Sequence, residues 1–231
     1  MNMRRLFMVG AMVLATAGTL VAEESSGKRF AAGPKVWYAD NGSKTEPLWG
    51  GMASFDVTPR IRVSGMYLQG EYDQEDCDEM NSDSEILAAY HLRYLDLGAG
   101  FRYLGFDVDL AEGWRWYTEQ ELGYDEGAQR NADIYGPMVY AGSSYNFGKS
   151  PFGAYGEASW MFKDFGETDD MGFDGQHVNL EGGLTAQWKS LVAAVGYRYK
   201  RYADMPPKNV EGDTRKQNVV DGFTASLRVS F

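Results

Sequence analysis

The chain has 231 residues and a formal net charge of −11, with 33 acidic against 22 basic side chains. This acidity argues against a nucleic-acid partner, since phosphate backbones attract basic surfaces. A single cysteine, Cys77, excludes an internal disulfide. Beyond the N-terminus no stretch reaches the ~18 consecutive apolar residues of a membrane-spanning helix, so a membrane protein with this sequence would have to be a barrel.

The N-terminus has the pattern of a secretory signal peptide. Arg4 and Arg5 precede an apolar run from Leu6, and small residues lead to Ala22 before Glu23. We predict a signal peptide over residues 1–22 and one β-barrel domain over 23–231. Removing the first 22 residues takes away two basic and no acidic side chains, which leaves a net charge of −13.

Ten segments then alternate between apolar and polar residues with the period of two that is typical of β-strands. Short and long connections between them take turns, as in up-and-down barrels of the outer membrane. We therefore predict an all-β fold, a transmembrane up-and-down antiparallel β-barrel of ten strands in the cell outer membrane, with both termini in the periplasm. The expected strands are 34–41, 47–57, 60–73, 84–95, 97–107, 133–146, 152–163, 176–188, 190–203 and 217–231. Eight or twelve strands remain alternatives, the latter with an extra hairpin within 108–132.

The two faces of each segment separate a barrel from a secreted β-sandwich. In 176–188, Val178, Leu180 and Leu184 share one face and His177, Asn179 and Glu181 the other. Aromatic residues of the apolar face fall at strand ends, which predicts two interfacial girdles. The expected periplasmic girdle is Phe55, Tyr94, Phe147, Phe152, Trp188 and Phe231, and the expected outer girdle is Trp49, Tyr135, Trp160, Phe162 and Tyr199.

The last segment, VVDGFTASLRVSF, places an apolar residue at every second position up to Phe231. It resembles the closing strand of bacterial outer-membrane barrels, whose terminal Phe is part of the signal read during membrane insertion. We therefore expect Phe223, Leu227, Val229 and Phe231 to form an insertion signal for the barrel-assembly machinery.

The second half carries a more specific resemblance. The stretches YLDLGAGFRYLG, IYGPMVYAGSSYNF, SPFGAYGEASW and LVAAVGYRYKRY, followed by the last segment, resemble a family of small Gram-negative outer-membrane β-barrel proteins of unknown function. The match covers the chain from about Tyr94 onward. The resemblance implies the barrel fold and assigns no catalytic residues.

Charged residues on the polar faces predict a lumen charge network. Its expected members are Asp56, Arg62, His91, Arg93, Arg102, Glu157, Lys163, Glu181, Arg198, Lys200 and Arg228. Unpaired charges in a narrow lumen are costly, so we expect the carboxylates to bridge between the cations and plug the barrel. The alternative is a narrow anion-preferring pore, because seven cations face three carboxylates in this set.

Two expected outer loops have unusual composition. Residues 74–83 hold five acidic side chains around Cys77, which predicts a solvated loop or at most loosely held Ca²⁺ or Mg²⁺. No motif for a metal or cofactor is present, so we predict neither. The loop over 108–132 is rich in Trp and Tyr, which indicates surface contacts or a self-packed cap.

A further alternative is an outer-membrane enzyme acting on lipid A or peptides. The sequence has only two histidines, which limits the catalytic sites that such an enzyme could have. The two histidines, His91 and His177, are expected roughly 15–20 Å apart along the barrel, so they cannot share one site. We therefore predict no enzymatic activity, no catalytic residues and no cofactor. The favoured function is a monomeric barrel with a structural or surface-interaction role, in contact with outer-membrane lipids and lipopolysaccharide.

Overall fold

A computed structural model describes residues 30–40, 45–73, 77–110, 129–162, 177–202 and 219–231. Every regular element in these ranges is a β-strand. The strands are β1 (Phe30–Asp40), β2 (Thr45–Thr58), β3 (Ile61–Asp73), β4 (Cys77–His91), β5 (Asp96–Leu110), β6 (Gln129–Asn146), β7 (Phe152–Met161), β8 (His177–Trp188), β9 (Leu191–Tyr202) and β10 (Val219–Ser230). None of the described residues forms a helix long and apolar enough to cross a membrane.

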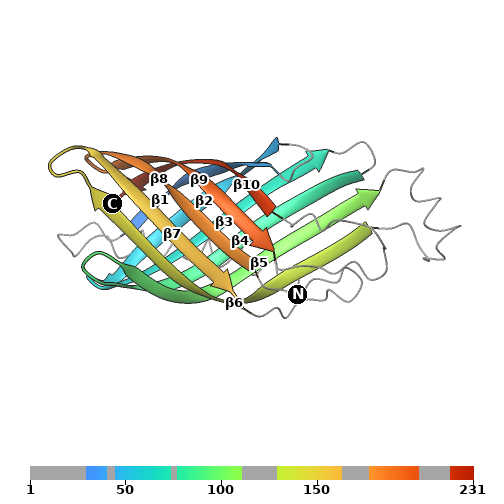
Figure 1. The fold of residues 1–231 in the computed structure, drawn as a ribbon, viewed down its shortest axis with the longest axis horizontal. Helices are drawn as coiled ribbons and strands as arrows, with labels where there is room; N and C mark the ends of the chain where they lie inside the picture. The colour runs from blue at the N-terminus through green and yellow to red at the C-terminus, as the bar shows by residue number, and fades with distance from the viewer. Residues whose placement is uncertain (1–29, 41–44, 74–76, 111–128, 163–176, 203–218) are drawn as a thin grey trace, which may run out of the picture.

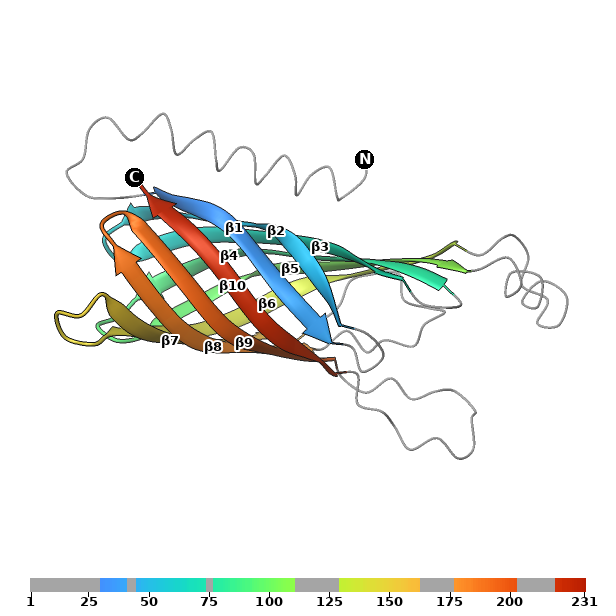
Figure 2. The same cartoon turned by 90° about the horizontal axis from the view of Figure 1, so that it is seen from above.

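The ten strands form a closed barrel in which each strand pairs antiparallel with its neighbours in sequence and β10 pairs with β1. Figures 1 and 2 show the strands tilted across the barrel axis, with the closing seam between β1 and β10. The predicted all-β up-and-down barrel of ten strands is confirmed. Closure pairs β1 with β10 along most of the seam, which a barrel in lipid requires because lipid cannot bond backbone groups.

The connections at one end of the barrel are short: 59–60, 92–95, 147–151 and 189–190. We call this the short-turn end; the chain enters β1 and leaves β10 there, as the C label in Figure 2 shows. The turn expected at 95–97 lies instead at 92–95, where the backbone N–H of Leu92 donates to the carbonyl of Leu95. This shift moves Arg93 out of β4 and into an exposed turn.

The predicted long acidic loop over 74–83 is wrong. β3 continues to Asp73 and β4 begins at Cys77, so Asp78 and Asp83 lie in a strand that pairs along its length with β3 and β5. β4, β5 and β6 have 15, 15 and 18 residues, whereas β8, β9 and β10 have 12 each. A tilted strand of ~9–11 residues spans a bilayer, so β4–β6 continue beyond the barrel wall as a sheet, visible at the right of Figure 2.

The outer wall of the barrel is apolar and exposed. Large side chains such as Leu184, Val195 and Phe223 point away from the barrel on β8, β9 and β10. Exposed aromatic residues gather at both ends, with Tyr38, Trp49, Trp160 and Phe162 at one and Tyr94, Phe147, Phe152, Trp188 and Phe231 at the short-turn end. Soluble monomers rarely expose such a continuous apolar surface, and two aromatic girdles around an apolar band suit the two interfaces of a bilayer.

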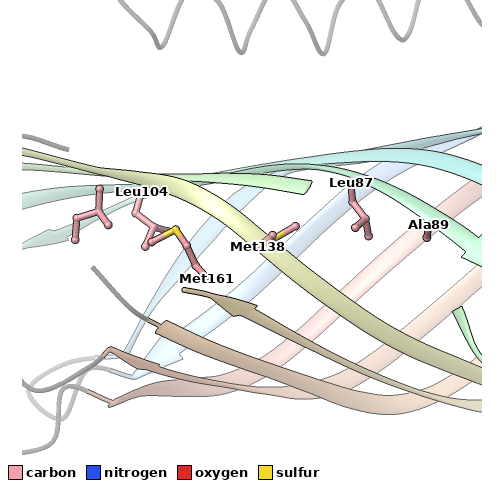
Figure 3. Close-up of a cluster of buried hydrophobic side chains, with 6 residues drawn as sticks. Leu87, Ala89, Leu104, Met138 and Met161 are labelled. Atoms are coloured by element: carbon pink, nitrogen blue, oxygen red, sulfur yellow. The ribbon is translucent and has the colours of Figure 1, made fainter. Parts of the chain in front are cut away.

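Two apolar clusters pack inside the barrel. The first contains Trp37, Ala39, Leu48, Met66 and Leu68 from β1, β2 and β3. The second contains Leu87, Ala89, Leu104, Ile134, Met138 and Met161 from β4 to β7, and Figure 3 shows its labelled members between the two walls. Side chains therefore fill part of the lumen, as expected for barrels of about eight to ten strands.

Glycines make room for one large lumen side chain. Gly183 of β8 and Gly196 of β9 are paired in register, and a Cβ on either would collide with the Tyr155 side chain. Tyr155 of β7 therefore extends over these two positions toward β9, where its hydroxyl donates to Glu181 of β8.

Several predictions fall outside the described residues. They include the signal peptide over residues 1–22, the lumen position of Lys163 and the Trp and Tyr side chains of the predicted loop over 108–132.

Candidate functional site

The most deeply buried charges lie in one group, which we call the upper charge cluster: Asp83, Arg102, Arg198 and Lys200. Asp83 is 2% exposed and Arg102 is fully buried. The Arg102 guanidinium donates two parallel hydrogen bonds to the Asp83 carboxylate, at 2.8 and 2.6 Å. Arg198 Nη2 and Lys200 Nζ donate to the same carboxylate, at 3.1 and 2.8 Å. One carboxylate from β4 therefore holds cations from β5 and β9 across the barrel.

The remaining surfaces of these cations are also covered. The Arg198 guanidinium lies 4.7 Å and the Lys200 ammonium 5.4 Å from the centre of the Trp37 ring, within the range of cation–π attraction. Arg198 Nε donates to Asn179 Oδ1 at 2.6 Å, and Arg102 Nη1 reaches Ser159 Oγ at 3.4 Å. Since buried charges are tolerated only when they are paired and hydrogen-bonded, these contacts explain how the cluster can sit inside the barrel.

Glu181 of β8 forms a second charged group with Lys35 of β1. Lys35 Nζ donates to both Glu181 oxygens, at 3.0 and 2.7 Å. The Tyr155 hydroxyl donates to Glu181 Oε1 at 2.9 Å and the Thr224 hydroxyl at 3.0 Å. β1 and β8 are separated in the barrel by β9 and β10, so the Lys35–Glu181 ion pair ties together strands that do not pair with each other.

The short-turn end carries weaker, more exposed pairs. Arg62 donates to Asp56 at 2.6 and 3.3 Å with roughly half of its side chain exposed. His91 Nδ1 lies 2.5 Å from Asp96 Oδ1 in a similarly open setting. Exposed pairs of this kind contribute only ~0–1 kcal/mol each, so this end is held together by strand pairing more than by charge.

Most of the predicted lumen residues lie in these groups or beside them. Asp56, Arg62, Arg102, Glu157, Glu181, Arg198, Lys200 and Arg228 line the interior, and His91 lies at its short-turn mouth. Arg93 does not belong to the network: it lies in the exposed turn, with its guanidinium 4.9 Å from the Tyr94 ring centre. Glu181 was expected to bridge arginines, whereas its ion pair is with Lys35.

Sequence reasoning missed four interior charges, Lys35, Asp83, Glu85 and Asp96. A signal for two of them was present, because Asp83 and Glu85 continue the face of Leu87 and Ala89 backwards by steps of two. The acidic run around Cys77 concealed this alternation. Lys35 shares its face with Trp37 and Ala39, and that apolar pair conceals a lumen-facing surface.

These additions change the charge balance of the lumen. Among the described side chains that form the lumen ion pairs or line the cavity between them, the cations are Lys35, Arg62, Arg102, Arg198, Lys200 and Arg228, and the carboxylates are Asp56, Asp83, Glu85, Asp96, Glu157 and Glu181. Six cations therefore face six carboxylates. The predicted excess of seven cations over three carboxylates is not present in the described lumen.

The two histidines lie at opposite ends of the barrel. His177 begins β8 at the end far from the short turns and is 2% exposed, whereas His91 ends β4 beside the short turn. The prediction that they do not share a site therefore agrees with the fold.

Comparisons with known proteins were made by sequence and by structure. No protein-family model and no curated protein matches the sequence. Among solved structures, the chain is similar to the following three proteins. Neisserial surface protein A has a TM-score of 0.35 and 10% identity, covering 90% of this chain and 100% of that one. The attachment invasion locus protein Ail of Yersinia pestis has a TM-score of 0.36 and 9% identity, covering 87% and 95%. The translocator domain of the autotransporter NalP from Neisseria meningitidis has a TM-score of 0.40 and 10% identity, covering 97% and 96%.

TM-scores below 0.5 carry no functional argument. The assignment to the class of closed antiparallel barrels therefore rests on the strand pairing of this chain, which closes from β1 to β10.

Proposed function

We propose that this chain is an integral outer-membrane β-barrel protein with a structural or surface-interaction role and a lumen closed by its own side chains. It is exported through the signal peptide over residues 1–22 and contacts outer-membrane lipids and lipopolysaccharide through its apolar belt. It acts as a monomer and has no enzymatic activity. The barrel-assembly machinery inserts it with the help of the outward face of β10, where Phe223, Leu227 and Phe231 are exposed.

The proposal of a closed lumen rests on the upper charge cluster and on Trp37, whose ring lies against Arg198 and Lys200. Arg102, Arg198, Lys200 and Trp37 are each at most 2% exposed, and they come from β5, β9 and β1. Every cation of the cluster is held by Asp83. A hydrated pore through this level would expose these side chains, so their burial favours a barrier to ions.

Planar-bilayer recording of the refolded protein tests this proposal. We expect no steady conductance from the wild type. The double variant Arg198→Ala/Lys200→Ala removes two side chains of the barrier and is expected to open measurable steps, while the exposed-turn variant Lys189→Ala should stay silent. Steady single-channel steps from the wild type would refute the closed lumen.

A narrow pore is the second candidate, but its predicted anion preference loses its basis in the described lumen, where the six cations are matched by six carboxylates. A conducting wild type with little ion preference would favour this candidate.

A further inference from the structure

A small cavity lies in the lumen between the upper charge cluster and the short-turn end. Its volume is about 120 Å³, and Met66, which lines it, also contacts Arg198 of the upper charge cluster. A second hollow of about 250 Å³ at the short-turn mouth shares Arg62, Ala89 and Asp96 with it. The cavity is therefore reached from the short-turn end and closed toward the other end.

The charges around this cavity are separated by sign. Lys35, Arg62 and Arg228 come from β1, β3 and β10, which lie on one arc of the barrel, β10–β1–β2–β3. Glu85, Asp96 and Glu157 come from β4, β5 and β7 on the next arc, β4–β5–β6–β7. The cavity thus has a cationic wall and an anionic wall, which a molecule with both charges would match.

Four of these six groups already have partners of opposite charge within the protein. Lys35 binds Glu181, Arg62 binds Asp56, Asp96 contacts His91, and Glu85 lies 3.5 Å from Arg102. The two groups that remain are Arg228 and Glu157.

Arg228 makes no hydrogen bond or ion pair with any other residue that the structure describes. Within the same part of the chain, Glu157 has one contact, a hydrogen bond from the Tyr140 hydroxyl at 3.4 Å.

Glu157 has a further reason to attract a cation. It lies directly beside Glu181 in the pairing of β7 with β8, and two neighbouring carboxylates repel each other. Lys35 neutralises Glu181 but does not bond Glu157. Arg228 also lines the cavity, but among the described residues no hydrogen bond or ion pair joins it to Glu157. One positive charge is lacking on the Glu157 side and one negative charge on the Arg228 side.

We propose that this cavity binds a small zwitterion of the size of the smallest α-amino acids, with its ammonium group on Glu157 and its carboxylate on Arg228. An apolar cavity of about 150 Å³ accommodates benzene, with its six non-hydrogen atoms, so about 120 Å³ accommodates a molecule of about five non-hydrogen atoms, the size of glycine. A single molecule with both charges satisfies both unfilled groups within that volume. The ligand enters from the short-turn side, which is the periplasmic side in the outer-membrane orientation.

Binding of glycine to the refolded full-length protein in detergent tests the proposal, measured by calorimetry and by saturation-transfer NMR. Acetate and methylammonium serve as probes with one charge each, and we expect each to bind at least about tenfold more weakly than glycine, since each loses one charged contact. Absence of glycine binding at about 10 mM, which saturates a site of millimolar affinity, would overturn the proposal. Equal binding of acetate or methylammonium would do so too.

Two variants separate loss of a contact from collapse of the cavity. Glu157→Gln should weaken glycine binding about tenfold or more and leave acetate binding intact. Arg228→Met should weaken glycine binding similarly and leave methylammonium binding intact. Glu71→Gln, at an exposed position of β3 outside the cavity, is the matched control and should bind glycine as the wild type does. Wild-type glycine affinity in Glu157→Gln or Arg228→Met, or loss of both single-charge probes in either variant, would contradict the assigned contacts.

Discussion

Replacing Asp83 with Asn is the most direct perturbation of the upper charge cluster. The amide keeps the size of the side chain but removes the negative charge with which Arg198 and Lys200 form ion pairs. Arg102 would lose its close carboxylate partner and keep a longer contact to Glu85, at 3.5 Å. Removing one partner of a buried ion pair typically costs ~3–5 kcal/mol, because the other charge is left uncompensated. With three cations affected, we expect a loss of about 4–5 kcal/mol in the free energy of unfolding.

The measurement is urea unfolding in detergent, followed by tryptophan fluorescence and by heat-modifiable migration. With an m-value of about 2 kcal/mol per M urea, the expected loss moves the unfolding midpoint down by about 2 M. Asp56→Asn is the matched control, because the Asp56–Arg62 pair has the same chemistry but is about a third to a half exposed. Exposed pairs contribute ~0–1 kcal/mol, so its midpoint should fall by less than about 0.5 M. Equal midpoints for the two variants would mean that water reaches Asp83, and the closed lumen would be refuted.

Three further predictions follow from single contacts. Glu181→Ala should lower the free energy of unfolding by ~3–5 kcal/mol, because Lys35 is then buried without its carboxylate, whereas the exposed Glu71→Ala should leave the urea midpoint within error. Gly196→Val should reduce the yield of folded barrel on refolding, since the valine side chain would collide with Tyr155 and the carbonyl of Gly182. The double variant Gly196→Val/Tyr155→Ala should recover part of that yield, because it removes one of the two collisions. Phe231→Ala should reduce the amount of protein assembled in the outer membrane more than Tyr145→Ala does. The reason is that the Phe231 ring stacks on Phe30 at the β1–β10 seam, with ring centroids 6.0 Å apart. Equal assembly of the two variants would show that the seam does not need this ring.

Period-two alternation, together with the lengths of the connections, was enough to predict the architecture of this protein. The outward rows of β8, β9 and β10 could be listed from the sequence because lipid demands an apolar residue at every second position, and this demand acts locally on each strand. The alternation of short and long connections gave the order of the strands and the end of the barrel that carries the short turns. The strand ends could not be predicted in the same way, because a strand extends as far as the neighbouring strands can hydrogen-bond it. The fourth strand was predicted to begin at residue 84, whereas β4 begins at Cys77, since β3 and β5 extend far enough to pair with it.

The interior was decided by tertiary structure. The residues that face the lumen contact other side chains, some apolar and some charged, and not a uniform solvent. Trp37 and Lys35 can therefore face the same interior as Asp83 and Arg102. The polarity of a residue then no longer shows whether its side chain points inward. The partners inside come from strands distant in sequence: Lys35 and Glu181 are 146 residues apart, and Asp83 and Lys200 are 117 apart. Which carboxylate meets which cation depends on the tilt of the strands and on how far each side chain reaches across the closed barrel. The sequence therefore determined the wall of this barrel, and only the closure of that wall determined which charges meet within it.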